Sequence, residues 1–198
     1  MKDITNNEMV FVLTIFKNPE AQYNANSISK IMRISRMGAL KIAKRLEKEE
    51  IISSKELGKA KFYTLNLANS YAKQYIKFLL LREAERAEPY VKAWISEIRK
   101  VKNADAAIIF GSVIRKHMEA NDIDVVFITN QARFQNLKKE LSEIASLNIK
   151  KIHAIYQTKE DFIKNIKKGD KIMLNAMKGI IAFGEEKIID IAVKLFQK

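Results

Sequence analysis

The stretch IIFGSVIRKHMEANDIDVVFIT, residues 108–129, contains two apolar runs separated by a polar segment. The first run ends at Gly111-Ser112, and nine residues then precede Asp122-Ile123-Asp124, which opens the second run. Both runs are short and nearly continuously apolar, which is typical of strands covered on both faces. Because residues i and i+2 of a strand project from the same face, roughly 6–7 Å apart, we expect the two carboxylates to point the same way.

Paired carboxylates of this kind are suited to holding a divalent cation on a triphosphate. Gly111 has no side chain to block a phosphate, and Ser112 can donate a hydrogen bond to one. If a helix begins there, its free N–H groups face the anion, and Arg115 can reach a phosphate from about one turn further on. The predicted nucleotide-binding residues are therefore Gly111, Ser112 and Arg115. The predicted metal ligands are Asp122 and Asp124, and the competing interpretation is that both are ordinary carboxylates at a strand start.

The order of strand, Gly-Ser, strand and Asp-x-Asp resembles the signature of the DNA-polymerase-β-type nucleotidyltransferases, especially the minimal family known by its initials as MNT. QTKEDF (157–162) is similar to the segment after that family's third strand, and GIIAFGEEKIIDIA (179–192) to its closing strand and helix. The resemblance covers about residues 90–198. It implies transfer of a nucleoside monophosphate from a nucleoside triphosphate to a hydroxyl acceptor, with Mg²⁺ or Mn²⁺ as cofactor. Acceptors among such relatives are small molecules, RNA ends or a protein.

The third predicted strand, KKIHAIYQT (150–158), departs from the family pattern. Active relatives usually carry a third carboxylate there, which completes the metal site and helps to deprotonate the attacking hydroxyl. Here the aligned position is His153 or an apolar neighbour. His153 can act as a catalytic base, because imidazole titrates near neutral pH, or it is a strand histidine without a chemical role. Glu160 and Asp161 lie past the strand, in the expected first turn of a helix, where acidic side chains favour the helix dipole.

This departure leaves two functions open. The first is a nucleotidyltransferase, and the alternative is a transcription regulator whose second domain senses a nucleotide without transferring it. The sequence supports nucleotide binding more strongly than turnover, so enzymatic activity is left undecided. It identifies neither the nucleotide base nor the acceptor.

The N-terminal third has a different pattern. Apolar spacing predicts a helix over 8–16, a second helix after it, and a third over RMGALKIAKRLEKEE (36–50), which Ser35 can cap. Two β-prone runs follow, at 50–54 and 60–66. In proteins with three helices and a hairpin in this order, the third helix enters the major groove of DNA.

Basic side chains of this segment are the predicted DNA contacts. With 3.6 residues per turn, most of the cations of the third helix fall opposite its apolar face, and the hairpin tip carries three lysines. Arg36 lies at the edge of the apolar face, from which its long side chain can reach a base. The full predicted set is Arg36, Lys41, Lys44, Arg45, Lys55, Lys59 and Lys61.

Residues 25–69 resemble the winged helix of MarR- and ArsR-type bacterial and archaeal regulators, with LEKEEII and GKAKFYTLN matching their third helix end and wing. The resemblance implies binding of double-stranded DNA and a role in transcription regulation. Because such regulators read paired half-sites, we expect a homodimer. The apolar run Phe78–Leu81 is more apolar than one buried stripe needs, and so it is the predicted dimer contact. The competing interpretation is a winged helix used for protein contacts alone.

The predicted fold class is α+β, in three parts. These are an N-terminal winged helix-turn-helix over 1–68, connecting and dimerisation helices over 69–102, and a nucleotidyltransferase-type mixed β-sheet flanked by helices over 103–198. The alternation of short strands and helices in the last part is what favours a sheet covered by helices.

The composition fits a folded protein that binds polyanions. The 198 residues carry a formal net charge of +13, which attracts nucleic acid or nucleotide phosphate. An AT-rich genome or a thermophile, both of which favour lysine, is the compositional alternative. There is no apolar run of ~18 residues, so no membrane span is expected. The sequence has no cysteine and no basic-then-apolar start, so we expect a cytoplasmic protein without disulfides or thiolate metal sites.

Overall fold

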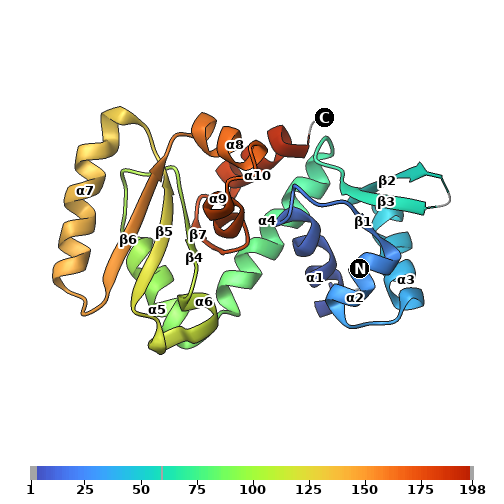
Figure 1. Cartoon of the computed structure of the whole chain (residues 1–198), viewed down its shortest axis with the longest axis horizontal. Helices are drawn as coiled ribbons and strands as arrows, with labels where there is room; N and C mark the ends of the chain where they lie inside the picture. The colour runs from blue at the N-terminus through green and yellow to red at the C-terminus, as the bar shows by residue number, and fades with distance from the viewer. Residues whose placement is uncertain (1–3, 59, 197–198) are drawn as a thin grey trace. The chain divides into compact units, whose positions relative to one another are not determined.

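Two separate cores form in the chain, as shown by a computed structural model that describes residues 4–58 and 60–196. One unit comprises Met1–Leu79 and Ala192–Lys198, and the other comprises Leu80–Ile191 (Figure 1). Helices and two sheets are both present, so the predicted α+β class is confirmed.

The chain passes between the units inside two helices, α4 (Ser70–Glu85) and α10 (Glu185–Phe196). The predicted connecting segment 69–102 is therefore divided between the two units and does not form a part of its own. The apolar run at Phe78–Leu81 spans the boundary in α4. The two central residues of this run, Leu79 and Leu80, are fully buried. The two outer residues, Phe78 and Leu81, are exposed.

The first unit has the element order of a winged helix. In chain order the elements are α1 (Asn6–Phe16), β1 (Tyr23–Asn24), α2 (Ala25–Met32), α3 (Arg36–Lys48), β2 (Ile52–Leu57) and β3 (Ala60–Leu65), followed by α4. The strands form an antiparallel sheet in the order β1-β3-β2, in which β2 and β3 are the hairpin. The predicted helices and hairpin are thus confirmed.

Polar side chains define the starts of these helices. At α1, Thr5 Oγ1 accepts a hydrogen bond from the backbone N–H of Glu8, and the Glu8 carboxylate accepts one from the N–H of Thr5, at 3.2 and 2.8 Å. This reciprocal pair satisfies two N–H groups that a helix start leaves free. Asn24 caps α2 in the same way, and Ser35 caps α3 as predicted.

The second unit is a four-stranded sheet with helices on both faces. In chain order its elements are α5 (Pro89–Ile98), β4 (Ala106–Phe110), α6 (Val113–Lys116), the 3₁₀ turn η1 (His117–Glu119), β5 (Asp122–Ile128), α7 (Gln131–Ser146), β6 (Lys151–Gln157), α8 (Lys159–Lys167), α9 (Lys171–Met177), β7 (Ile180–Phe183) and α10 (Glu185–Phe196). The strand order is β6-β5-β4-β7; only β5 and β6 are parallel.

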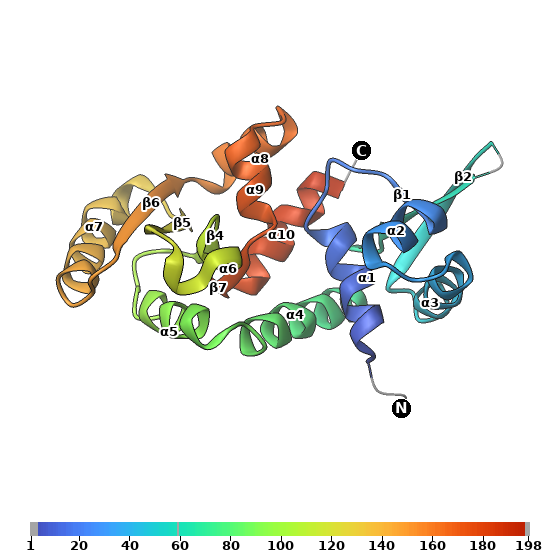
Figure 2. The same cartoon turned by 60° about the horizontal axis from the view of Figure 1, so that its bottom comes forward.

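Alternation along β5 separates the two faces of this sheet. Ile123, Val125 and Phe127 are completely buried in a core that α5 and α7 complete. The intervening residues project from the opposite face, which carries α8 and α9 (Figure 2). Asp122 and Asp124 are therefore placed on the α8–α9 face, pointing the same way as predicted.

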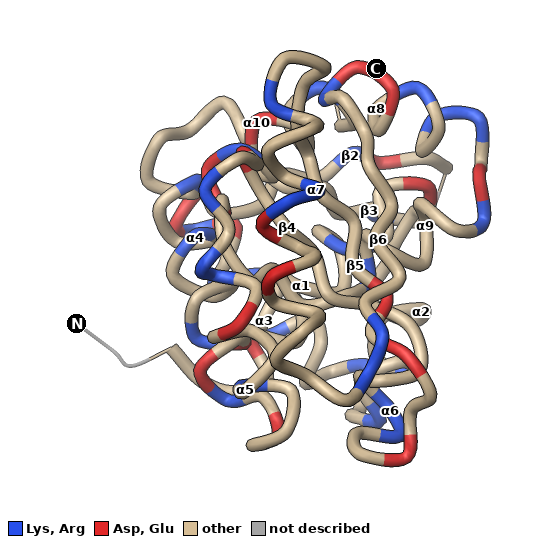
Figure 3. The backbone as a smooth tube through the Cα atoms, turned by 90° about the vertical axis from the view of Figure 1, so that its left-hand side faces the viewer, with Lys and Arg blue, Asp and Glu red and all other residues tan. Residues whose placement is uncertain are grey.

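Charge is spread over the helices. In the view of Figure 3, both basic and acidic residues occur along helices such as α5 and α7, while most of the strand path carries neither. Among the described residues, no helix is both long enough and apolar enough to cross a bilayer.

A charged cluster joins two helices to the start of β4. The Asp105 carboxylate accepts a hydrogen bond from Arg133 of α7 at 2.6 Å and lies 3.4 Å from Lys187 of α10. Partial burial alone would raise the pKa of Asp105, but the hydrogen bond and charge of Arg133, with the charge of Lys187, hold that pKa below its ordinary value. The ionised carboxylate therefore stabilises the sheet that carries Asp122 and Asp124.

We predict that Asp105→Asn lowers the free energy of unfolding by about 1 kcal/mol near neutral pH, since the partners are one-third exposed and partly screened. The folded-state pKa is depressed, so this contribution is complete above the unfolded-state pKa of about 3.9 and is lost as pH falls through the folded-state pKa. Urea unfolding at pH 7 and at successively lower pH measures the difference from wild type, which should shrink in acid.

The control is Asp190→Asn, which removes an exposed carboxylate from α10. It should leave the free energy of unfolding almost unchanged at both pH values. A difference between Asp105→Asn and wild type that stays constant into acid would contradict the electrostatic explanation.

Candidate functional site

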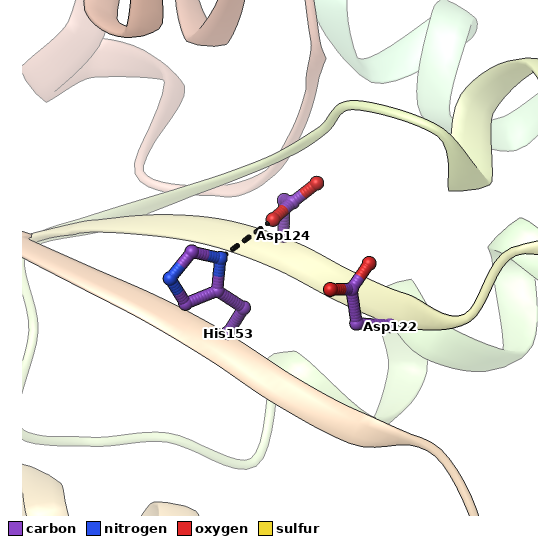
Figure 4. Close-up of side chains that lie close together, drawn as sticks. All are labelled: Asp122, Asp124 and His153. Carbon is purple, nitrogen blue, oxygen red and sulfur yellow. Dashed lines mark hydrogen bonds and ion pairs between the residues drawn. The ribbon is translucent and has the colours of Figure 1, made fainter.

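Parallel strand pairing brings three polar side chains together at the start of β5. Asp124 is aligned with His153 of β6, and Asp122 is aligned two residues earlier, with Lys151. Donor atoms of Asp122, Asp124 and His153 all lie within 4.8 Å of one another. Figure 4 shows the His153 ring beside the two carboxylates, on the same side of the strands. This grouping has the spacing of a metal-binding site.

A hydrogen bond joins two members of this group. Nδ1 of His153 lies 2.9 Å from Oδ1 of Asp124. Since a carboxylate only accepts, Nδ1–H is the donor when the ring is neutral, and Nε2 then carries the lone pair. The His153 side chain is 63% exposed and that of Asp124 is 21% exposed, so the ring is the more accessible of the two groups.

Gly111 provides the space that Asp124 occupies. Its φ of +79° lies in the left-handed region, which glycine adopts without a steric penalty. A Cβ built on Gly111 would overlap Oδ2 of Asp124. Gly111 was predicted to leave room for a phosphate. In the structure, the Asp124 carboxylate fills the space next to it.

Ser112 and Arg115 follow Gly111 in a very short helix. The half-buried Ser112 precedes α6, and its carbonyl accepts from the N–H groups of Arg115 and Lys116. Arg115 is exposed. The predicted helix start is present, but α6 has only four residues and is followed by His117, whose φ is +51°. Arg115 is therefore on a tight turn beside the site.

The third acidic group expected by resemblance is replaced by His153. Within residues 4–58 and 60–196, the metal-compatible group found around Asp124 contains His153 as its third member. Glu160 and Asp161 lie in the first turn of α8, as predicted, where Thr158 Oγ1 accepts from the N–H of Asp161 at 3.0 Å. Of the two positions considered on the third strand, the histidine and not an apolar neighbour faces the carboxylates.

A comparison with protein families gives the site its context. Residues 93–178 match the family described as polymerase beta, nucleotidyltransferase. This part of the chain is a nucleotidyltransferase domain. Asp122, Asp124, His153 and the Gly111 turn all lie within the matched range.

Two further comparisons concern whole proteins. Solved structures that resemble the chain include the adhesin competence repressor (AdcR) from Streptococcus pyogenes, which is 14% identical with a TM-score of 0.37, over 50% of this chain and 69% of that one. They also include a mutant of ZitR from Lactococcus lactis, which is 16% identical with a TM-score of 0.35, over 50% of this chain and 64% of that one. The search of curated proteins gives no match.

Outside the nucleotidyltransferase domain, α3 presents a cationic face. Lys41 and Lys44 are exposed on this helix, on the side away from the buried Ala39 and Ala43, and Arg36 is exposed at the edge of the buried face. Lys55 of β2 is exposed as well. Lys59 lies outside the described residues.

Two of the predicted DNA contacts are engaged within the first unit. Arg45 is only 28% exposed and pairs with two carboxylates of this unit, the buried Glu8 at 2.7 Å and Glu49 at 3.1 Å. Lys61 lies 2.8 Å from Glu47. The helix wheel of α3 does not indicate the ion pair of Arg45 with Glu8. A sequence signal for Glu8 exists, because Thr5 and Glu8 have the Thr-x-x-Glu spacing of a capping box.

We predict that Gly111→Ala abolishes binding of Mn²⁺ at the nucleotidyltransferase site, because the added methyl group displaces the Asp124 carboxylate. The left-handed φ adds about 1–2 kcal/mol of backbone strain. Titration calorimetry measures the metal binding, and thermal unfolding measures the strain.

Gly169→Ala is the matched control. Its φ is +77°, but a Cβ there has open space around it. Gly169→Ala should therefore cost similar backbone strain and leave metal binding intact. Equal metal affinities in the two variants would show that the space beside Gly111 does not matter to the site.

Proposed function

We propose that the nucleotidyltransferase domain binds a nucleoside triphosphate with Mg²⁺ or Mn²⁺ and transfers the nucleoside monophosphate to a hydroxyl acceptor. The observation that carries this proposal is the convergence of Asp122, Asp124 and His153 beside the Gly111-Ser112 turn. Asp122 and Asp124 would hold the cation. Ser112 and the exposed Arg115 are placed on the adjoining turn to contact the triphosphate.

The donor set fits a divalent cation. Carboxylate oxygens are the ligands that Mg²⁺ and Mn²⁺ accept, and the pair comes from a rigid strand with a buried face. In the transfer, the acceptor hydroxyl gives its proton to solvent water and its oxygen bonds to the α-phosphorus, while the bond from the α-phosphorus to the α–β bridging oxygen breaks and pyrophosphate leaves. When bound, the cation neutralises negative charge that develops on the phosphate oxygens. The chain's own part is to hold the triphosphate so that the acceptor oxygen is in line with the leaving group.

A nucleotide sensor without transfer is the second candidate function. The specific observation in its favour is that the third-strand position holds His153, where active relatives carry a carboxylate. Incubating the full chain and a cell extract with each α-labelled nucleoside triphosphate separates the two. A labelled acceptor supports transfer, whereas nucleotide binding without any labelled product supports sensing.

We predict that Asp122→Asn and Asp124→Asn each abolish metal-dependent nucleotide binding while the domain stays folded. Asparagine keeps the size of the side chain but removes the charge on which cation binding depends. Calorimetry with a nucleoside triphosphate and millimolar Mn²⁺ measures the affinity. The control is Glu119→Gln, which removes an exposed carboxylate from the turn before β5 and should bind nucleotide like wild type. Undiminished nucleotide binding in both Asp variants would refute the proposed site.

The winged helix is proposed to bind double-stranded DNA and so to couple the nucleotide domain to transcription. This proposal depends on the exposed cations of α3 and on the hairpin that follows it. The ion pairs of Arg45 and Lys61 shift the expected phosphate contacts toward Lys41, Lys44 and Lys55. We also propose a homodimer through the exposed Phe78 and Leu81 of α4, which would present two α3 helices to paired half-sites.

We predict that Lys41→Ala combined with Lys44→Ala weakens binding to all duplex sequences alike. The plot of log affinity against log salt concentration has a negative slope, and each lost phosphate contact should make that slope less steep by roughly 0.9. Arg36→Ala should instead change the sequence preference, since the first residue of α3 is placed to reach a base. Fluorescence anisotropy on genomic duplexes across a salt series measures both effects.

The matched control is Lys92→Ala, which removes an exposed cation from α5 in the other unit. Its salt slope should equal that of wild type. If wild-type protein binds no genomic duplex at low salt, the winged helix does not serve DNA binding.

A further inference from the structure

We propose that His153 is a metal ligand, and that it makes this site select a first-row transition-metal ion over Mg²⁺. This inference rests on the proposed function, because it concerns the cation held by Asp122 and Asp124. It replaces the two roles predicted for His153, a catalytic base and an inert strand histidine, with a third. The distances between donor atoms, the exposure of the His153 ring and the chemistry of its nitrogen each support it.

The first support is the distance between donor atoms. Around an octahedral ion with bonds of about 2.1 Å, neighbouring ligand atoms stand about 3 Å apart. Nδ1 of His153 and Oδ1 of Asp124 are already 2.9 Å apart, and the Asp122 donor lies within 4.8 Å of both. A cation on the open side of Asp124 can therefore be reached by all three residues after a small rotation of side chains.

The second support is the freedom of the imidazole ring. Because 63% of the His153 side chain is exposed, Nδ1 can exchange its proton with water and turn from Asp124 to a cation. The proton then resides on Nε2, where water can accept its hydrogen bond, as is usual for a metal-bound histidine. Oδ2 of Asp124 occupies the space that a Cβ at Gly111 would fill, so the carboxylate is seated against the Gly111 turn on its other side.

The third support is the chemistry of the donors. Mg²⁺ is a hard ion that prefers oxygen and depends on the charge of its ligands. Replacing a third carboxylate by imidazole removes one negative charge and one oxygen donor, which weakens Mg²⁺ binding. Imidazole nitrogen strengthens the binding of first-row ions in the order Mn²⁺, Fe²⁺, Co²⁺. The Asp-Asp-His set is therefore expected to rank Co²⁺ above Mn²⁺ and Mn²⁺ above Mg²⁺.

Metal titration of the full chain tests this ranking without nucleotide and without any activity measurement. Calorimetry at constant pH gives the dissociation constants of Mg²⁺, Mn²⁺ and Co²⁺ for wild type and for His153→Asp. In His153→Asp, the ratio of the Mg²⁺ to the Co²⁺ dissociation constant should fall by about tenfold or more, because the third donor becomes a charged oxygen. His153→Ala should lower the same ratio by weakening Co²⁺ binding. His117→Asn is the matched control, since it removes the other histidine of the sequence, and should keep the wild-type ratio.

Pulsed electron paramagnetic resonance of the Mn²⁺ complex tests direct coordination. Wild type should show coupling of Mn²⁺ to an imidazole ¹⁴N nucleus, and His153→Asp should not. Metal binding with no nitrogen coupling and with the same ion ranking in wild type and His153→Asp would overturn the inference while leaving the proposed function intact. Absence of any metal binding to wild type, with or without a nucleoside triphosphate, would overturn both.

Discussion

The parallel register between β5 and β6 is the constraint on which the site depends. Asp122 and Asp124 come from one strand, but their partner His153 comes from another. His153 is aligned with Asp124 although it lies 29 residues later in the sequence. A slip of one residue would turn His153 to the opposite face, because side chains alternate along a strand. The pairing of two backbones therefore decides whether the two carboxylates meet a nitrogen donor or an apolar side chain.

Apolar packing on the reverse face of the sheet maintains this register. Phe127 of β5 and Tyr156 of β6 stack with ring centroids 6.3 Å apart, and Phe134 of α7 meets Tyr156 edge-on at 4.9 Å. Lys138, one turn along α7, lies over the Phe134 ring at 4.6 Å. These contacts involve both strands and the helix that connects them. Because a shifted β6 would withdraw Tyr156 from both rings, the reverse face opposes any slip that would dismantle the site.

Local rules were sufficient for much of this architecture, and they failed where distant residues meet. The i, i+2 rule placed Asp122 and Asp124 on one face, and the turn at Gly111 followed from residue type. The side chain that shares space with Gly111 is 13 positions away in the sequence, so spacing alone did not indicate that Asp124 occupies it. In the same way, a helix wheel for α3 placed most of its cations opposite the apolar face but did not indicate the ion pair of Arg45, because it contains no information about Glu8 on another helix. The identity of the third-strand residue opposite Asp124 needed the register, which local patterns do not contain.

The pairing of Arg45 with Glu8 gives the first helix an influence over the electrostatic field of the third. Glu8 is almost completely buried and neutralises a guanidinium that would otherwise add to the cationic face of α3. A change that removes the Glu8 charge would take away one of the two carboxylates paired with Arg45, although α1 carries none of the proposed DNA contacts. Non-specific attraction to polyanions would then increase, at the expense of discrimination between sequences. If the winged helix binds DNA as proposed, a substitution at this buried position of α1 can therefore change its selectivity without altering any of the proposed contacts.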